Sequence, residues 1–352
     1  MEAQKLTNED LSRWRQVGKL AALGILLSYV EAFVPIPIPG VKLGLANIAV
    51  LLALAQHDTV GALCVAFIKV FASGLLFGSP LTIAYSACGT LLSLVGMVPL
   101  SRLRTMRLWM VSIVGALLHE AGQLMVASHL LGTSVVWYLA PVLAIAGCTC
   151  GLACGLLAQQ FERAIQDTRD ANSNENEPVS LVFDPDPPPT GIIVALVVLL
   201  VYTVILLRIS DVRIACGCVA LALVVCFVSP VTPHDLWCGI RPLTPLLVCT
   251  IVLQLVLSPQ TALHESALAC TRLVGVSIAA TAFMSIVPTD DLTCTVGWAL
   301  SPLAHLGIDS RGFLVAFDVA VQTVPRLISN VEAHPHRLRD LPGVVIDSFA
   351  RL

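Results

Sequence analysis

Long apolar runs follow one another along most of the chain, with short polar segments between them. In the first half they cover residues 17–34, 45–56, 61–77, 81–100, 108–131 and 135–158. In the second half they cover residues 191–207, 212–228, 243–257 and 267–286. A helix needs about 20 mainly apolar residues to cross a bilayer, so the runs predict six membrane helices, several of them short, and then four more. The pattern predicts an all-α integral membrane protein.

A polar segment interrupts this pattern at residues 161–190, "FERAIQDTRDANSNENEPVSLVFDPDPPPT". It is first acidic and amide-rich and then proline-rich, so it can bury little apolar surface and is expected to act as a tether. The sequence therefore predicts a membrane module at 1–160, a cytoplasmic linker at 161–190 and a second module at 191–352.

The pattern changes again after Pro288, where short apolar stripes alternate with Asp, His and Arg. This segment is too polar for simple membrane spans. Such stripes are typical of amphipathic helices, which we expect at the inner membrane surface or against a partner.

Composition and charge support a membrane protein. Hydrophobic residues make up 57% of the 352 residues and charged residues only 12%, against about 25% charged in soluble domains. The few Lys and Arg gather before the first run, between the fourth and fifth, and after the sixth. An even number of runs separates these clusters, so a cytoplasmic amino terminus satisfies the positive-inside rule at all three. No basic face suited to nucleic acid is present.

The 12 cysteines lie mostly inside apolar runs. There they are typical of small packing residues rather than of a disulfide framework. We expect no metal site.

Prolines at 35, 37 and 39 in "VPIPIPGVKLGLANI" disfavour a regular helix between the first two runs. Irregular backbone at membrane depth survives where protein or a water-filled cavity satisfies its polar groups, so this segment is expected to line or cover a cavity near the outer face. Lys42 could meet an anionic or carbonyl-bearing ligand there, with Asn47 as a hydrogen-bonding neighbour. The alternative is an interfacial lysine on a tight outer turn.

Several polar side chains lie inside apolar runs. His119, Glu120 and Gln123 fall in the fifth run, and His119 and Gln123 share a helix face because they are four residues apart. Three interpretations are open: these residues line a ligand cavity, act as a proton-sensitive pair, or hold neighbouring helices together by hydrogen bonds. Lys69 in the third run either contacts a ligand or pairs with Glu31 or Glu120.

Small residues form two stripes. Ala21, Gly24 and Ser28 lie on the first predicted helix, and glycines recur at 147, 151 and 155 on the sixth. Both stripes allow another helix to approach closely. Internal packing is the favoured interpretation and a docking surface the alternative.

The sequence lacks the motifs of two enzyme classes. The sequence has no G-x-x-x-x-G-K-[ST] loop for nucleotide phosphates, so the chain is not expected to hydrolyse ATP through one. It also has no D-D-x-x-D array for Mg²⁺-diphosphate chemistry, which argues against autonomous prenyl transfer.

The segments "PGVKLGLANIAVLLAL" and "GALLHEAGQL" carry a resemblance. Residues 10–160 resemble the bacterial family called heptaprenyl diphosphate synthase component I, or Gx transporter, which is similar to the substrate-capturing S components of energy-coupling factor (ECF) transporters. The resemblance implies a six-helix bundle whose pocket lies below the loop between helices one and two, with Lys42 and Asn47 at the pocket. It also implies that the stripe of Ala21, Gly24 and Ser28 faces a transmembrane partner.

Residues 191–352 resemble the T component of the same transporters, most clearly in "SIVPTDDLTCTVGWALSPLAHLGIDSRGFLVAFDVAVQTVPRLISNVEAH". In that family, amphipathic helices and Ala-Arg-Gly-type motifs contact the ATPase subunits. Here "HPHRLRDLPG" and the final "FARL" are partial equivalents, so Arg337, Arg339 and Arg351 are the candidate ATPase contacts. For Arg337 and Arg339, anchoring at anionic lipid headgroups is the alternative.

Together these observations predict fused S and T modules of an ECF-type importer in the bacterial cytoplasmic membrane. The substrate would be a small vitamin-like or precursor molecule, which Lys42, Asn47, Lys69, His119, Glu120 and Gln123 would bind. The chain would need no cofactor of its own, because partner subunits would hydrolyse ATP. The alternative is an accessory subunit of prenyl diphosphate synthesis.

Overall fold

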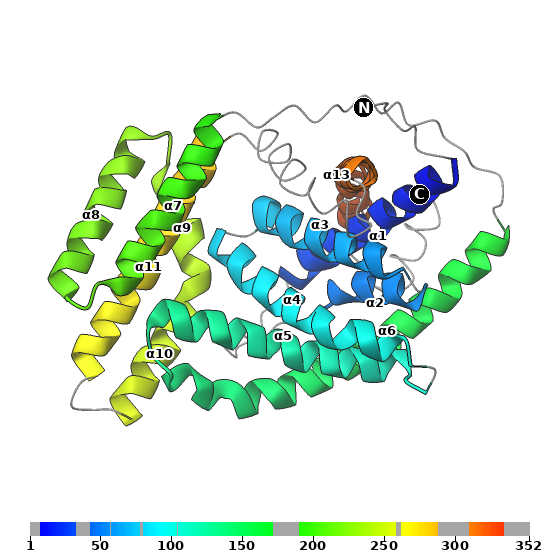
Figure 1. The fold of residues 1–352 in the computed structure, drawn as a ribbon, viewed down its shortest axis with the longest axis horizontal. Helices are drawn as coiled ribbons and strands as arrows, with labels where there is room; N and C mark the ends of the chain where they lie inside the picture. Colours follow the sequence, from blue (N-terminus) through cyan, green and yellow to red (C-terminus); the bar gives the residue numbers. More distant parts are fainter. Residues whose placement is uncertain are drawn as a thin grey trace.

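The computed structural model describes residues 8–32, 43–56, 58–77, 80–103, 105–171, 190–257, 262–287 and 310–333. Within these ranges the chain forms twelve α-helices and two short 3-10 helices, with no β-strand (Figure 1). The predicted all-α class is therefore confirmed for this part of the chain.

The helices of the first half follow the apolar runs closely. They are α1 (Asn8–Ala32), α2 (Asn47–Ala55), α3 (Thr59–Phe77), α4 (Pro80–Ser101), α5 (Leu108–Leu131), the 3-10 helix η1 (Val135–Leu139) and α6 (Ala140–Ala171). The later helices are α7 (Thr190–Arg208), α8 (Val212–Val228), α9 (Pro233–Ile240), η2 (Arg241–Leu243), α10 (Thr244–Leu257), α11 (Ala262–Ile286) and α13 (Ser310–Ala333). The sequence analysis did not predict α9, which begins with a Thr232–Asp235 capping box and has Pro233 in its first turn.

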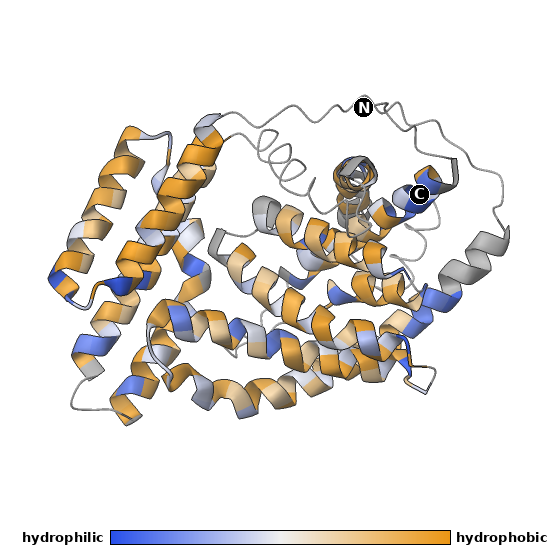
Figure 2. Cartoon of the chain, in the orientation of Figure 1, coloured by the Kyte–Doolittle hydropathy of each residue, from blue (hydrophilic) through white to orange (hydrophobic). Residues whose placement is uncertain are grey.

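Fewer helices than predicted are long and apolar enough to cross a bilayer. Five in the described ranges meet both conditions: 82–101, 108–131, 135–163, 190–208 and 263–286. The bent pair α9 and α10 makes a sixth candidate. Apolar colour predominates on these helices in Figure 2, with polar patches at several turns and within α5. The chain is therefore a multi-pass membrane protein, although α2, with nine residues, is too short to span by itself.

The first six helices pack into one bundle, in which α1 lies against α2 and α3. Ala21, Ile25 and Leu26 of α1 are fully buried, and they share a core with residues 48–54 of α2 and with the apolar face of α3. Helices α4, α5 and α6 continue the bundle, each packed along the next. Residues from all six helices line a cavity inside this bundle.

Two glycines, Gly151 and Gly155, let α6 approach α5 closely. A Cβ atom on Gly151 would lie 2.9 Å from the Cα of Ile113, and one on Gly155 would lie 2.4 Å from the Cα of Trp109. One on Gly147 would meet only ordinary contacts, the nearest being Glu120 Cγ at 3.5 Å. The close packing predicted from the four-residue spacing is therefore confirmed, and it lies inside the bundle.

The helices α7 to α11 form a second group. The buried Arg272 of α11 donates a 2.6 Å hydrogen bond to the carbonyl oxygen of Ile209, in the turn between α7 and α8. Leu268 and Leu273 of α11 share an apolar cluster with Leu124 and Leu131 of α5. Large apolar side chains on α7 and α8 stay exposed, as expected for surfaces that face lipid.

Helix α13 lies apart from α7 to α11 and packs along α1 (Figure 1). Its residues Phe313, Ala316 and Ala320 are buried in the core of the first bundle. A Cβ on Gly18 would lie 2.7 Å from the Ala316 carbonyl oxygen, so the two helix backbones are close together. The amphipathic face expected at the membrane surface or on a partner is thus covered by α1 of the same chain.

The linker predicted at 161–190 begins later than expected. Helix α6 continues to Ala171, because residues 161–171 contain neither proline nor glycine and favour a helix. Residues 172–189 lie outside the described ranges.

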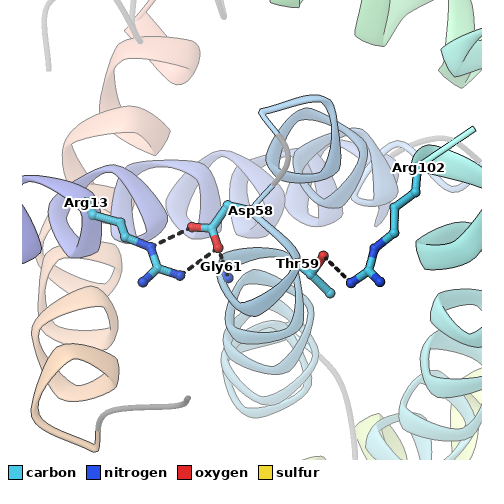
Figure 3. A network of polar contacts seen from close by, with 5 residues as sticks. All are labelled: Arg13, Asp58, Thr59, Gly61 and Arg102. Atoms are coloured by element: carbon cyan, nitrogen blue, oxygen red, sulfur yellow. Dashed lines mark hydrogen bonds and ion pairs between the residues drawn. The ribbon is translucent and has the colours of Figure 1, made fainter. Parts of the chain in front are cut away.

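An ion pair fastens α1 to the connection before α3 (Figure 3). Arg13 donates to Asp58 from Nε at 3.0 Å and from Nη2 at 2.7 Å, and Asp58 also accepts a 2.7 Å hydrogen bond from the Gly61 amide. Nearby, Arg102 after α4 donates to the hydroxyl of Thr59 at 3.4 Å. These contacts hold the ends of α1, α3 and α4 together.

We expect this ion pair to make a small, pH-dependent contribution to stability. Burial raises the pKa of the Asp58 carboxyl, but the hydrogen bonds from Arg13 and Gly61 and the charge of Arg13 bring it below its ordinary value. The contribution is therefore complete above the unfolded pKa of about 3.9 and is lost as the pH falls through the lower folded pKa. Because 43% of Arg13 is exposed, Asp58→Asn should lower the free energy of unfolding by at most about 1 kcal/mol.

Thermal unfolding of both forms in detergent, from pH 7 to pH 3, measures this contribution. The carboxamide of the Asp58→Asn variant can still accept from the Gly61 amide, so the comparison isolates the ionic contact. If the two unfolding midpoints differed equally at every pH, the ion pair would not be the cause.

Candidate ligand-binding cavity

A cavity of about 250 Å³ lies inside the first bundle. Residues from α1 to α6 and from the segment just before α2 line it, and polar side chains are frequent among them. Its ionisable and amide residues are Glu31, Asn47, Lys69, His119 and Glu120, and its hydroxyl residues are Ser28, Ser73, Thr82, Ser86, Thr90 and Ser112. The volume is near the lower end of small-molecule sites, which run from about 300 to 1,000 Å³.

Asn47 and Lys69 meet at one wall of the cavity. Asn47 is the first residue of α2, and its side-chain oxygen accepts a hydrogen bond from the Lys69 ammonium on α3. Lys69 is only 4% exposed. A buried ammonium in an apolar helix is costly unless polar groups surround it, and here the cavity provides them.

Glu31 lies near the carboxyl end of α1 and reaches the segment that leads into α2. Its Oε1 accepts a 2.9 Å hydrogen bond from the amide of Gly44. Gly44 has a φ of +75°, in the left-handed region that glycine adopts without strain. The sequence analysis named Glu31 only as a candidate partner of Lys69, so its place in the cavity was missed.

The three polar residues of α5 do not share one environment. His119 and Glu120 line the cavity, while Gln123 is buried and its side-chain amide lies 3.1 Å from His119 Nε2. The predicted shared face of His119 and Gln123 is thus confirmed. The His119 ring also packs against α4, where a Cβ on Gly89 would lie 2.9 Å from it. His119 therefore serves both as a cavity wall and as a helix contact.

A row of hydroxyl groups on α4 was missed altogether. Thr82, Ser86 and Thr90 are spaced four residues apart, so they share one face of the helix, and all three line the cavity. The Thr90 hydroxyl is buried without a hydrogen-bond partner in the described part of the chain, and the residue is only 6% exposed. The four-residue spacing of hydroxyls in an apolar run could have revealed this face.

The stripe on α1 lies within the bundle. Ala21 is fully buried, and a Cβ on Gly24 would lie 3.2 Å from Ala49 of α2 and 3.4 Å from the Cβ of Lys69. Ser28 lines the cavity and donates to the Gly24 carbonyl oxygen at 3.0 Å. In this conformation the stripe packs against α2 and α3.

The other predicted site residues, Lys42, Arg337, Arg339 and Arg351, lie outside the described residues. Within the described ranges, no three His, Cys, Asp or Glu side chains gather as a metal site would require. The cavity residues can donate and accept hydrogen bonds and provide charge, which suits recognition of a small polar molecule.

One comparison with known proteins found a match, over the part of the chain that contains this cavity. The sequence matches neither a curated protein nor a solved structure. A family model does match, and it covers residues 20–161, which include the second half of α1, all of α2 to α5, α6 up to Phe161 and every described residue that lines the cavity. The helical bundle of the first half thus matches the family described as heptaprenyl diphosphate synthase component I.

Proposed function

We propose that this chain is the membrane subunit of an ECF-type importer in which the first bundle captures a small molecule. The polar cavity inside that bundle carries the proposal, because buried charged and hydroxyl groups in a membrane helix bundle usually mark a substrate site. In the proposed orientation, with the amino terminus in the cytoplasm, the segment before α2 lies on the outer side and substrate enters there.

The packing of α13 on α1 supports coupling between the two halves. Helix α13 belongs to the half that resembles a T component, yet its buried face packs against α1 of the bundle that contains the cavity. A shift of α13 would reach α1 directly, and α1 contributes Ser28 and Glu31 to the cavity. The contact gives a short physical route from the cytoplasmic helices to the ligand.

Energy would come from partner ATPase subunits, because the sequence contains no P-loop for nucleotide phosphates. The proposed chain is a transport subunit rather than an enzyme, holds no cofactor, and resides in the bacterial cytoplasmic membrane. Arg337, Arg339 and Arg351 remain the proposed ATPase contacts.

The alternative, an accessory role in prenyl diphosphate synthesis, receives less support from the cavity. A polyprenyl chain is almost entirely apolar and would need an apolar lining of matching length. Most of the lining surface is apolar, but hydroxyl, amide and charged side chains from α1 to α5 also line the cavity. Burying a hydrocarbon chain against those groups would leave them without hydrogen bonds.

Mild-detergent purification of the tagged full-length chain from its native membrane tests the proposal. We expect ATPase subunits in the eluate by mass spectrometry, and we expect their loss when residues 334–352, which contain the three arginines, are deleted. A prenyl transferase subunit in place of the ATPases, with prenyl transfer activity in the eluate, would contradict the importer and support the alternative.

A further inference from the structure

The charges that line the cavity do not balance. Among the described residues, Glu31 and Glu120 contribute two carboxylates and Lys69 contributes one ammonium. With His119 counted as neutral, these described residues together carry one net negative charge. An uncompensated charge is costly in a site of low dielectric, so a ligand of opposite charge would bind favourably there.

Glu31 is placed to meet such a ligand. Its Oε1 is held by the Gly44 amide, which fixes the carboxylate on the segment entering α2. Glu31 is one of the lining residues, and its other oxygen accepts no hydrogen bond from the described residues. A carboxylate oxygen is an acceptor only, so the ligand group facing it must be an N–H or O–H donor, and a charged donor gives the stronger bond.

Thr90 provides independent evidence that something fills the cavity. Thr90 is one of the lining residues, and its buried hydroxyl has no partner among the described residues, which leaves the desolvation penalty of that group unmet there. Buried polar groups without partners are rare, so each one suggests a missing ligand or water. A ligand with a polar group near α4 would satisfy this hydroxyl.

We propose that the cavity binds a small organic cation, a protonated amine, amidine or amino-heterocycle, with Glu31 accepting its charged N–H group and Thr90 hydrogen-bonding a second polar group. The inference rests on the proposed function, since it names the substrate class of the same site. The cavity of about 250 Å³ limits the ligand to a small molecule.

Two isosteric variants and two matched controls test this inference. Glu31→Gln removes the charge but keeps an oxygen for the Gly44 amide, and Thr90→Val removes only the hydroxyl. The controls are Glu265→Gln, at an exposed position on α11, and Thr203→Val on α7, whose hydroxyl donates to the Leu199 carbonyl oxygen at 2.8 Å.

The full-length chain in lipid nanodiscs is incubated separately with two pools of bacterial metabolites, one retained on a cation exchanger and one on an anion exchanger. Small molecules that stay bound through gel filtration are measured by mass spectrometry. We expect retention from the cationic pool, at least about tenfold weaker in Glu31→Gln and Thr90→Val than in the controls. The inference would be overturned if molecules were retained from the anionic pool only or from neither pool. It would also be overturned if Glu31→Gln retained cationic molecules as well as the unchanged protein does.

Stability of the empty protein separates a binding role of Thr90 from a structural one. Because the hydroxyl lacks a partner among the described residues, Thr90→Val should leave the unfolding midpoint without ligand unchanged or higher. A lower midpoint would show that the hydroxyl supports the fold instead. Binding of cations without ATPase co-purification would refute the importer alone, and ATPase co-purification without bound cations would refute this ligand class alone.

Discussion

Gly18→Leu is expected to separate α13 from α1 and to uncouple the two halves of the protein. Even a Cβ atom at position 18 would lie 2.7 Å from both the Ala316 carbonyl oxygen and the Val319 Cβ. Because one of these atoms belongs to the backbone of α13, a side-chain rotation cannot relieve the contact. The overpacking should destabilise the α1–α13 contact by at least about 1–3 kcal/mol, and we expect transport to fall with it.

Tryptophan fluorescence can follow this separation. Trp14 is 2% exposed, and a Cβ on Gly312 of α13 would lie 2.0 Å from its ring, so α13 covers the indole. In a protein whose other tryptophans are replaced by Phe, Gly18→Leu should shift the Trp14 emission to longer wavelength. Gly191→Leu on α7 is the control, since a Cβ there has no neighbour within 4 Å. An unshifted emission with normal transport would mean that α13 does not depend on this contact.

Gly155→Ala is expected to destabilise the first bundle through the contact between α5 and α6. The added methyl group would lie 2.4 Å from the Cα of Trp109, so the helices must move apart although the substitution favours helix formation. Overpacking of this kind lowers the free energy of unfolding by about 1–3 kcal/mol. Because α5 and α6 both line the cavity, ligand retention should fall as well.

The matched control is Gly217→Ala on α8, where a Cβ would meet nothing within 4 Å. There the same change should be neutral or raise stability by up to about 1 kcal/mol, the helix propensity difference alone. Thermal unfolding in detergent measures both variants. Equal midpoints for the two would contradict the close approach of α5 and α6.

The apolar pattern predicted the helices well because each run is long and bounded by charged or helix-breaking residues. The fifth run, 108–131, coincides with α5. The short helix α9 was missed because it lies between the runs 212–228 and 243–257, although Thr232, Pro233 and Asp235 form a helix start. Helix α6 extended into the predicted linker because its polar residues still favour a helix when no proline or glycine interrupts them.

The candidate site was partly predictable. Asn47, Lys69, His119 and Glu120 stood out because polar groups are rare in apolar runs, and the structure brings all four to one cavity. Thr90 did not stand out, because a single hydroxyl in a membrane helix usually bonds to its own backbone. Its lack of a partner among the described residues appears only when α4 is packed against the other helices.

Local composition and periodicity are enough to predict that the chain is helical and membrane-embedded, and they show which side chains are unusual inside its helices. Tertiary structure alone decided what those side chains face. Three contacts join residues that are distant in the chain. They are the packing of α13 on α1, the packing of the α1 stripe inside the bundle, and the hydrogen bond between Glu31 and the Gly44 amide. Such contacts depend on the packing of complementary surfaces, which no local pattern encodes.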